Sequence, residues 1–85
     1  MTIVYTSKFE REYKHLPEEV KDLAEQKQII FQNNPFDASL NTHKLKGKMK
    51  DYWSWSINYK YRIIFYFKNK KEVWYLSVGD HDIYC

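Results

Sequence analysis

The run Trp53-Ser54-Trp55-Ser56-Ile57, followed by Tyr61-Arg62-Ile63-Ile64-Phe65-Tyr66-Phe67, decides the fold of this 85-residue chain. In the first run large apolar residues alternate with serines, and this period of two predicts a half-buried strand with a small polar face. The second run is almost continuously apolar apart from Arg62, which favours a central strand. Asn58-Tyr59-Lys60 is predicted to form the short turn between them. The two runs therefore predict an antiparallel strand pair.

The segments on either side of this pair extend the predicted sheet. Lys68-Asn69-Lys70-Lys71 is a polar hairpin turn, and residues 72–78 form a further strand that Gly79 is expected to end. At the other end of the chain, Ile3-Val4-Tyr5-Thr6 is a β-branched and aromatic run that is typical of a strand.

Two helices are predicted between the first strand and the others. Ser7-Lys8-Phe9-Glu10 fits a capping box and begins the first, Pro17 separates the two, and Asn33-Asn34-Pro35 ends the second. The predicted fold class is α+β with the order β-α-α-β-β-β, in which a helical hairpin packs on one face of a twisted antiparallel sheet. Residues 1–85 are expected to form a single domain, and the other face of the sheet is expected to carry Ser54, Ser56 and Arg62.

Composition places the chain among globular proteins, because 44% of its residues are hydrophobic and 29% are charged. No apolar run reaches membrane-spanning length, and the first residues lack the basic and apolar regions of a signal peptide. The single cysteine, Cys85, cannot form an internal disulfide, so the fold does not depend on an oxidising compartment. We therefore expect a cytoplasmic protein with no membrane partner.

Positive charge is concentrated in the second half of the chain. Residues 1–42 hold five Lys and Arg against seven Asp and Glu, whereas residues 43–85 hold nine against four. The segment His43-Lys44-Leu45-Lys46-Gly47-Lys48-Met49-Lys50 contributes most of this excess. If it is extended, its four lysines point to one side. They are then either a solvated edge that discourages aggregation or a row of phosphate contacts.

Two residues stand out as candidates for chemistry. Arg62 interrupts an apolar strand, and it either pairs with Glu72, Asp80 or Asp82 or binds a phosphate through its planar fork. His81 is flanked by Asp80 and Asp82, and histidine is the residue type whose unperturbed pKa lies close to neutral, so it can act as an acid or a base. Together with the lysines these are components for cleaving RNA without a metal, and His43 is a candidate second base.

Several aromatic residues could stack on RNA bases: Tyr52, Trp55, Tyr61 and Tyr84. The chain has no glycine-rich phosphate loop, no Cys and His spacing for zinc and no defensible Ser-His-Asp arrangement. We therefore predict that it needs no cofactor and no metal.

In this order and spacing, a series of segments along nearly the whole chain resembles the RelE/ParE superfamily of toxins from type II toxin-antitoxin modules. The segments are Ser7-Lys8-Phe9, Leu16-Pro17, His43-Lys44-Leu45-Lys46-Gly47, Tyr52-Trp53-Ser54, Tyr61-Arg62-Ile63-Ile64-Phe65 and Val78-Gly79-Asp80-His81-Asp82-Ile83-Tyr84. The resemblance implies a helical hairpin on one face of a twisted antiparallel sheet. It also implies a cognate antitoxin that forms a hetero-oligomer with the toxin, and a ribosome and mRNA as targets.

RelE-like members of this superfamily are ribosome-dependent mRNA endonucleases, and the resemblance assigns matching roles here. Arg62, His81, Lys46 and Tyr84 correspond to catalytic positions, while the RNA-binding positions are His43, Lys44, Lys48, Lys50, Tyr52 and Tyr61. Ser56 stands near where many relatives carry an arginine. The alternatives are a ParE-like inhibitor of DNA gyrase and a catalytically inactive, antitoxin-binding module, and neither needs Arg62 and His81 to converge.

Overall fold

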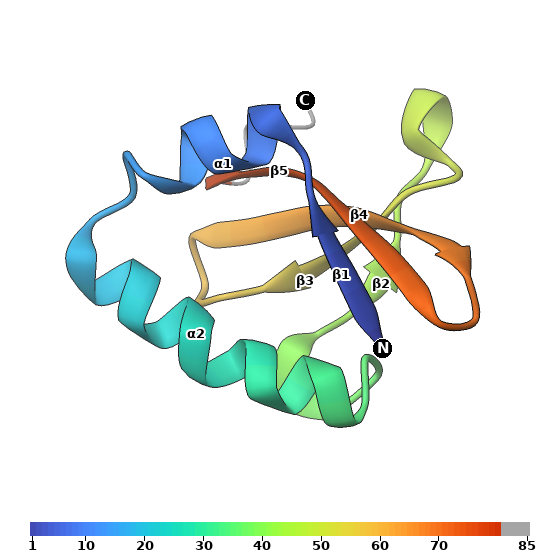
Figure 1. The fold of residues 1–85 in the computed structure, drawn as a ribbon, viewed down its shortest axis with the longest axis horizontal. Helices are drawn as coiled ribbons and strands as arrows, with labels where there is room; N and C mark the ends of the chain where they lie inside the picture. Colours follow the sequence, from blue (N-terminus) through green and yellow to red (C-terminus); the bar gives the residue numbers. More distant parts are fainter. Residues whose placement is uncertain (81–85) are drawn as a thin grey trace.

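A computed structural model, which describes residues 1–80, places five strands in one sheet with the order β1-β5-β4-β3-β2 (Figure 1). The strands are β1 (Thr2–Tyr5), β2 (His43–Lys44), β3 (Trp53–Ser56), β4 (Tyr61–Asn69) and β5 (Glu72–Asp80). The helices are α1 (Ser7–Tyr13) and α2 (Glu18–Asn33), and the short 3-10 helices are η1 (Ala38–Leu40) and η2 (Gly47–Met49). The predicted α+β fold is confirmed, and the two-residue strand β2 is an addition to it.

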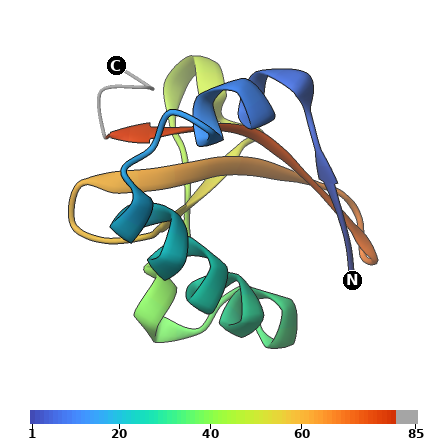
Figure 2. The same cartoon turned by 60° about the vertical axis from the view of Figure 1, so that its left-hand side comes forward.

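The hydrophobic core lies between α2 and one face of the sheet (Figure 2). Phe31 of α2 has its ring centroid 5.7 Å from that of Trp55 in β3, 5.1 Å from Phe65 in β4 and 5.9 Å from Tyr75 in β5. All four rings are fully buried. Because strand side chains alternate, the residues next to these three strand positions point away from α2, to what we call the outer face.

Helix α1 runs along the edge of β5 at the point where β1 has ended. β1 pairs with the first half of β5, and the Thr6 hydroxyl then donates to the carbonyl oxygen of Tyr75 at 2.8 Å. Thr6 also accepts from the backbone N–H of Phe9 at 3.2 Å, so Thr6 is the N-cap of α1. The capping box predicted at Ser7 is therefore wrong by one residue, since Ser7 already lies within the helix.

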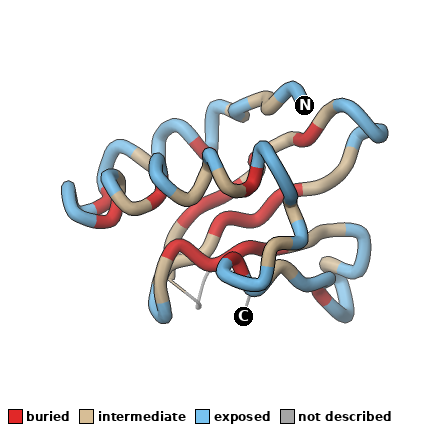
Figure 3. Tube along the Cα trace, turned by 90° about the horizontal axis from the view of Figure 1, so that it is seen from below, coloured by how far each residue is buried: buried red, intermediate tan, exposed pale blue. Residues whose placement is uncertain are grey.

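Burial along the trace follows the arrangement of the helices and the sheet, with the central strands mostly buried and the loops exposed (Figure 3).

Two details of the predicted sheet differ from the structure. The sheet is mixed, because β1 runs parallel to β5 while β4 is antiparallel to both β3 and β5. Gly79 does not end β5, which continues to Asp80 because Gly79 pairs with Arg62 in the β4–β5 ladder.

The basic segment forms a strand only at His43 and Lys44. Gly47, with a φ of +69°, begins the turn of η2, and the N–H of Leu45 donates to the carbonyl oxygen of Tyr52 at 2.9 Å. A residue with positive φ breaks strand geometry and is most often glycine. The lysines therefore do not form the single row that an extended segment would give.

Candidate nucleic-acid interface

The strand register defines two rows of side chains across β3, β4 and β5 on the outer face. The rows are Ser54–Ile64–Ser77 and Ser56–Arg62–Gly79. Arg62 thus lies between a serine and a glycine, two of the smallest residues. The predicted placement of Ser54, Ser56 and Arg62 together on the face away from the helices is confirmed by this register.

The guanidinium of Arg62 is half-buried and only partly satisfied. Its Nη1 donates to the carbonyl oxygen of Tyr59 at 3.2 Å, while its Nε is buried without a hydrogen-bond partner. Among residues 1–79, no carboxylate forms an ion pair with Arg62. A buried guanidinium N–H without a partner is costly, so this position requires an explanation.

The predicted ion-pair alternative for Arg62 is not met by Glu72. Glu72 lies at the opposite end of β5, in register with Asn69, and its carboxylate accepts a hydrogen bond from the indole N–H of Trp74. Asp82 lies outside the described residues.

Two serine hydroxyls beside Arg62 also lack partners. The Oγ atoms of Ser54 and Ser56 are buried with no hydrogen bond, on positions adjacent in register to Ile64 and Arg62. Native structures satisfy most buried polar atoms, so such a cluster requires an explanation. A bound anion is one, since hydroxyl and guanidinium groups are all donors.

In the core, the Trp55 indole N–H and the Tyr75 hydroxyl are also buried without a hydrogen-bond partner. Their ring centroids are 6.4 Å apart, and burial raises the pKa of the Tyr75 hydroxyl. This pair lies under α2 and away from the outer face, so it plays no part in the candidate interface.

The other end of the outer face is aromatic. The Tyr66 ring lies between Tyr52, at 6.3 Å between centroids, and Trp74, at 5.9 Å. The Nζ of Lys68 is 5.8 Å from the centroid of Trp74. Aromatic rings combined with cations provide stacking surfaces for bases of single-stranded nucleic acid.

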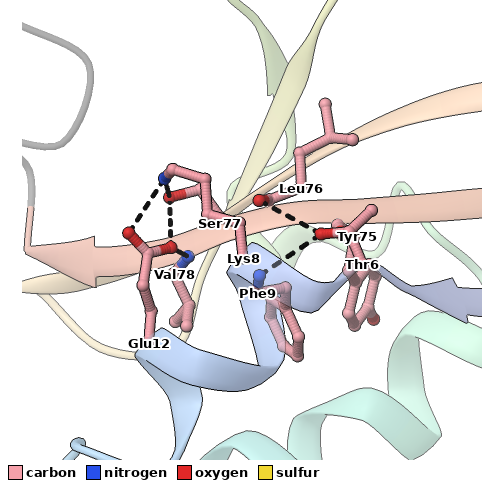
Figure 4. Close-up of polar contacts among 8 residues, drawn as sticks. All are labelled: Thr6, Lys8, Phe9, Glu12, Tyr75, Leu76, Ser77 and Val78. Atoms are coloured by element: carbon pink, nitrogen blue, oxygen red, sulfur yellow. Dashed lines mark hydrogen bonds and ion pairs between the residues drawn. The ribbon is translucent and has the colours of Figure 1, made fainter.

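Lys8 of α1 reaches the outer face through a hydrogen-bond network (Figure 4). Its Nζ donates to Glu12 Oε2 at 2.9 Å and to Ser77 Oγ at 3.0 Å, and Ser77 Oγ donates to Glu12 Oε1 at 2.7 Å. Burial by itself would raise the pKa of Glu12, but hydrogen bonds from Lys8, Ser77 and the N–H of Val78 outweigh it and lower this pKa. Glu12 is therefore a carboxylate that holds Lys8 beside the sheet.

A groove of about 360 Å³ lies between Lys8 and the η2 loop on the outer face. Ile64 and Leu76 contribute apolar surface to it, Met49 and Tyr52 line it from the loop, and Lys8 lines it from α1. A cation thus faces an apolar and aromatic surface across a space wide enough for part of a nucleotide.

The RNA-binding residues predicted from sequence are divided between the two faces. His43 pairs in register with Ser54 and so belongs to the outer face, where its Nδ1 lies 3.0 Å from the carbonyl oxygen of Asn41. Tyr52 lines the groove. Lys44 pairs with Trp53, and Tyr61 packs against the core, so both lie on the opposite face from Arg62.

The remaining predicted residues lie in the η2 loop or beyond the described part of the chain. Lys46, Lys48 and Lys50 are all exposed in and around η2, at the margin of the outer face. His81 and Tyr84 lie outside the described residues, so their predicted roles stay predictions.

Sequence reasoning missed Lys8, Tyr66, Trp74 and Ser77. The period of two from Arg62 through Ile64 would have reached Tyr66 and Lys68. No local pattern connects Lys8 to Ser77, because 69 residues separate them.

Within residues 1–80 no group of three His, Cys, Asp or Glu side chains could hold a metal ion. In the same part of the chain no helix is long and apolar enough to cross a membrane.

Solved structures with the same arrangement include three toxins. A YoeB/ParE toxin from Agrobacterium tumefaciens has a TM-score of 0.78 at 19% identity, covering 95% of this chain and 99% of its own. YafQ from Escherichia coli has a TM-score of 0.74 at 21% identity, with 94% and 92% covered. A toxin-antitoxin complex from Mycobacterium tuberculosis has a TM-score of 0.77 at 16% identity, with 94% and 96% covered.

Two helices packed against a five-stranded mixed sheet therefore define a protein with the RelE-like toxin fold. The family model described as a bacterial toxin of a type II toxin-antitoxin system, YafQ, matches residues 1–84, and the chain belongs to this family. A comparison with curated proteins found no match.

Proposed function

We propose that this toxin is a ribosome-dependent mRNA endonuclease, which cuts the message in the ribosomal A site and so inhibits translation. The observation that carries the proposal is the Arg62 guanidinium, half-buried beside Ser56 with an unpartnered Nε. Arginine is the preferred bidentate ligand of phosphate. A phosphodiester at this point would satisfy Nε and bring its oxygens to the unpartnered serine hydroxyls.

The proposed reaction is attack of a ribose 2′-hydroxyl on the adjacent phosphorus. The bond between the 2′ oxygen and phosphorus forms and the bond to the 5′ oxygen of the next nucleotide breaks, which leaves a 2′,3′-cyclic phosphate and a 5′-hydroxyl. A base must take the proton of the 2′-hydroxyl, an acid must protonate the leaving oxygen, and cations must stabilise the pentacoordinate phosphate.

Arg62 and Lys46 are the proposed cations, and His81 is the proposed acid or base. His43 is a candidate for the complementary role, since its register with Ser54 puts it on the same face of the sheet as Arg62. Tyr84 is proposed as a stacking or catalytic aromatic residue. The assignments of His81 and Tyr84 rest on the resemblance to RelE-like toxins.

The message and ribosomal RNA are proposed to lie along the outer face. Lys48, Lys50 and Lys8 would contact phosphates from its two margins, while Tyr52, Tyr66 and Trp74 would stack on bases. Lys44 and Tyr61 lie on the opposite face, so they would reach ribosomal RNA only from the other side of the sheet.

The protein partner is proposed to be a cognate antitoxin, which forms a hetero-oligomer with this chain in the cytoplasm. The family description and the structural similarity to a toxin bound in a toxin-antitoxin complex support this assignment.

The test is induced expression of wild type, Arg62→Ala and His81→Ala, with growth followed and cellular mRNA ends mapped. We expect growth arrest with new 5′ ends inside translated codons for wild type, and a loss of cleavage of about 100-fold or more in Arg62→Ala, because one stabilising donor of a transition state contributes that much. Arg62→Lys is the matched variant that keeps the charge and removes the fork, and we expect it to recover only part of the activity.

Arrest without new mRNA ends would contradict the proposal and favour gyrase inhibition. Retention of full cleavage by Arg62→Ala would remove Arg62 from the site. An absence of arrest in all variants would favour a module that binds antitoxin without catalysis.

A further inference from the structure

A second surface lies on the α2 side of the sheet, at the opposite end of the strands from Arg62. Phe36, in the loop after α2, meets Trp53 at 5.4 Å and 75° and stacks on Phe67 at 5.9 Å and 27°. Trp53 and Phe67 are in turn 5.7 Å apart. Phe36 nevertheless remains 56% exposed, whereas the rings under α2 are fully buried. We call Phe36, Trp53 and Phe67 the aromatic patch.

The aromatic patch borders a hollow of about 630 Å³. Pro35 and Val73 add to its apolar lining, while Asn69 and Lys70 are its polar residues. The apolar surface here is contiguous, because three aromatic rings adjoin one another beside the hollow. Ile29 on α2 is 65% exposed, but it is an isolated apolar residue. Isolated exposed apolar residues are normal on protein surfaces, but contiguous ones mark interaction sites.

The surroundings of the hollow are basic. Lys70 lines the hollow and Lys71 follows it in the β4–β5 turn; both are exposed, and within residues 1–80 neither forms an ion pair. A fitting partner therefore presents apolar side chains flanked by carboxylates. A second copy of this chain fits less well, because a symmetric contact would bring two lysine-rich turns together.

We propose that the aromatic patch is the docking site for an apolar and acidic segment of the antitoxin. This inference rests on the toxin-antitoxin part of the proposed function and is independent of nuclease activity. The patch and Arg62 lie on opposite faces and at opposite ends of β4, since Phe67 and Arg62 are near its two ends. The antitoxin thus holds the toxin at a site that the RNA does not use.

The test is titration calorimetry of the purified full-length toxin with the purified product of the reading frame that adjoins the toxin gene. We expect Phe36→Asp to weaken binding at least about 100-fold, because a carboxylate would enter an apolar site and meet the acidic partner. Ile29→Asp is the matched control, which adds the same charge at another exposed apolar position, and it should bind like wild type. Circular dichroism checks that both variants fold.

A second variant tests the charge without touching the apolar contacts. Lys70→Glu combined with Lys71→Glu should weaken binding about 10-fold or more at low salt, and less at high salt. The corresponding reversal at Lys14, which follows α1, should have little effect.

Unchanged affinity of folded Phe36→Asp would overturn the proposal, as would an equal loss in Ile29→Asp. A dimer of the toxin alone that Phe36→Asp dissociates would overturn it too, and would assign the patch to self-association. Growth arrest by toxin variants in the absence of antitoxin is a separate measurement, so a failure of the nuclease proposal is distinguishable from a failure of this one.

Discussion

The two faces of the same three strands differ in the side chains that they carry, with aromatic rings toward α2 and an arginine among small polar residues on the outer face. Toward α2, the rings of Trp55, Phe65 and Tyr75 close around Phe31. On the outer face, Arg62 and its serine neighbours retain buried donors without partners. Because a strand points alternate residues to opposite sides, one segment can build a closed core and reserve its other face for a ligand. Stability and binding should therefore separate by face.

Adjacent residues of β4 give the largest effect that tests this separation. Phe65→Ala should destabilise the fold by about 3–5 kcal/mol, because it removes a fully buried ring. Tyr66→Ala, on the outer face, should cost less and should instead weaken binding of a single-stranded RNA oligonucleotide by stacking loss. Urea unfolding and fluorescence anisotropy measure the two effects. Equal destabilisation by both substitutions would break the comparison.

A smaller effect is expected at Lys8, on the margin of the outer face. Lys8→Ala should reduce RNA affinity about 3- to 10-fold. The negative slope of the logarithm of the association constant against log salt should become shallower by about 0.7, as for the loss of one phosphate contact to a single strand. Stability should change by less than about 1 kcal/mol, because the ion pair with Glu12 is partly exposed. Lys14→Ala, at the exposed C-cap of α1, is the control, and an identical effect there would show that only net charge matters.

The smallest expected effect concerns the pH dependence of stability through Glu12. Its pKa in the folded state is lowered below the ordinary value of 4.5, since hydrogen bonds from Lys8, Ser77 and Val78 outweigh the opposing effect of burial. The folded state then binds the proton less tightly than the unfolded chain does. The carboxylate therefore stabilises the fold above the unfolded pKa, and this contribution is lost as the pH falls through the folded pKa.

Urea unfolding of wild type and Glu12→Gln between pH 7 and pH 3 measures this contribution. Wild type should be the more stable at pH 7, and the difference should shrink as the pH falls below about 4.5. A difference that stays constant with pH would show that Glu12 acts through packing or through neutral hydrogen bonds instead.

Much of the fold was predictable because it follows from local patterns. The alternation around Trp55 predicted β3 and its polar face, and the apolar run around Phe65 predicted the central strand β4. Errors arose where a pairing partner decides the outcome. Gly79 is typical of a strand end, yet its ladder with Arg62 continues β5. The turn at Gly47 also means that the lysine segment does not meet the condition under which its four side chains would point to one side.

The candidate site was less predictable than the fold. Arg62 was found because an arginine in an apolar strand is unusual, and its neighbours Ser54 and Ser56 followed from the same period of two. A lysine and a tyrosine are suitable RNA-binding residues, so Lys44 and Tyr61 are predicted to act beside Arg62. The strand register instead places both on the other face of the sheet. The aromatic patch went unpredicted as well, because Phe36 lies in a loop with no periodicity.

The sequence by itself determined the order of the elements, the inward and outward sides of the strands, and the resemblance that identified the toxin class. These properties follow from the alternation of side-chain direction and the pattern of apolar residues, both of which are set within a few residues of sequence. Only the tertiary structure decided that Lys8 meets Ser77, that β1 runs parallel to β5, and that Phe36 joins Trp53 and Phe67. Those contacts join segments far apart in the chain, and their geometry is set by how the helices and the sheet pack together.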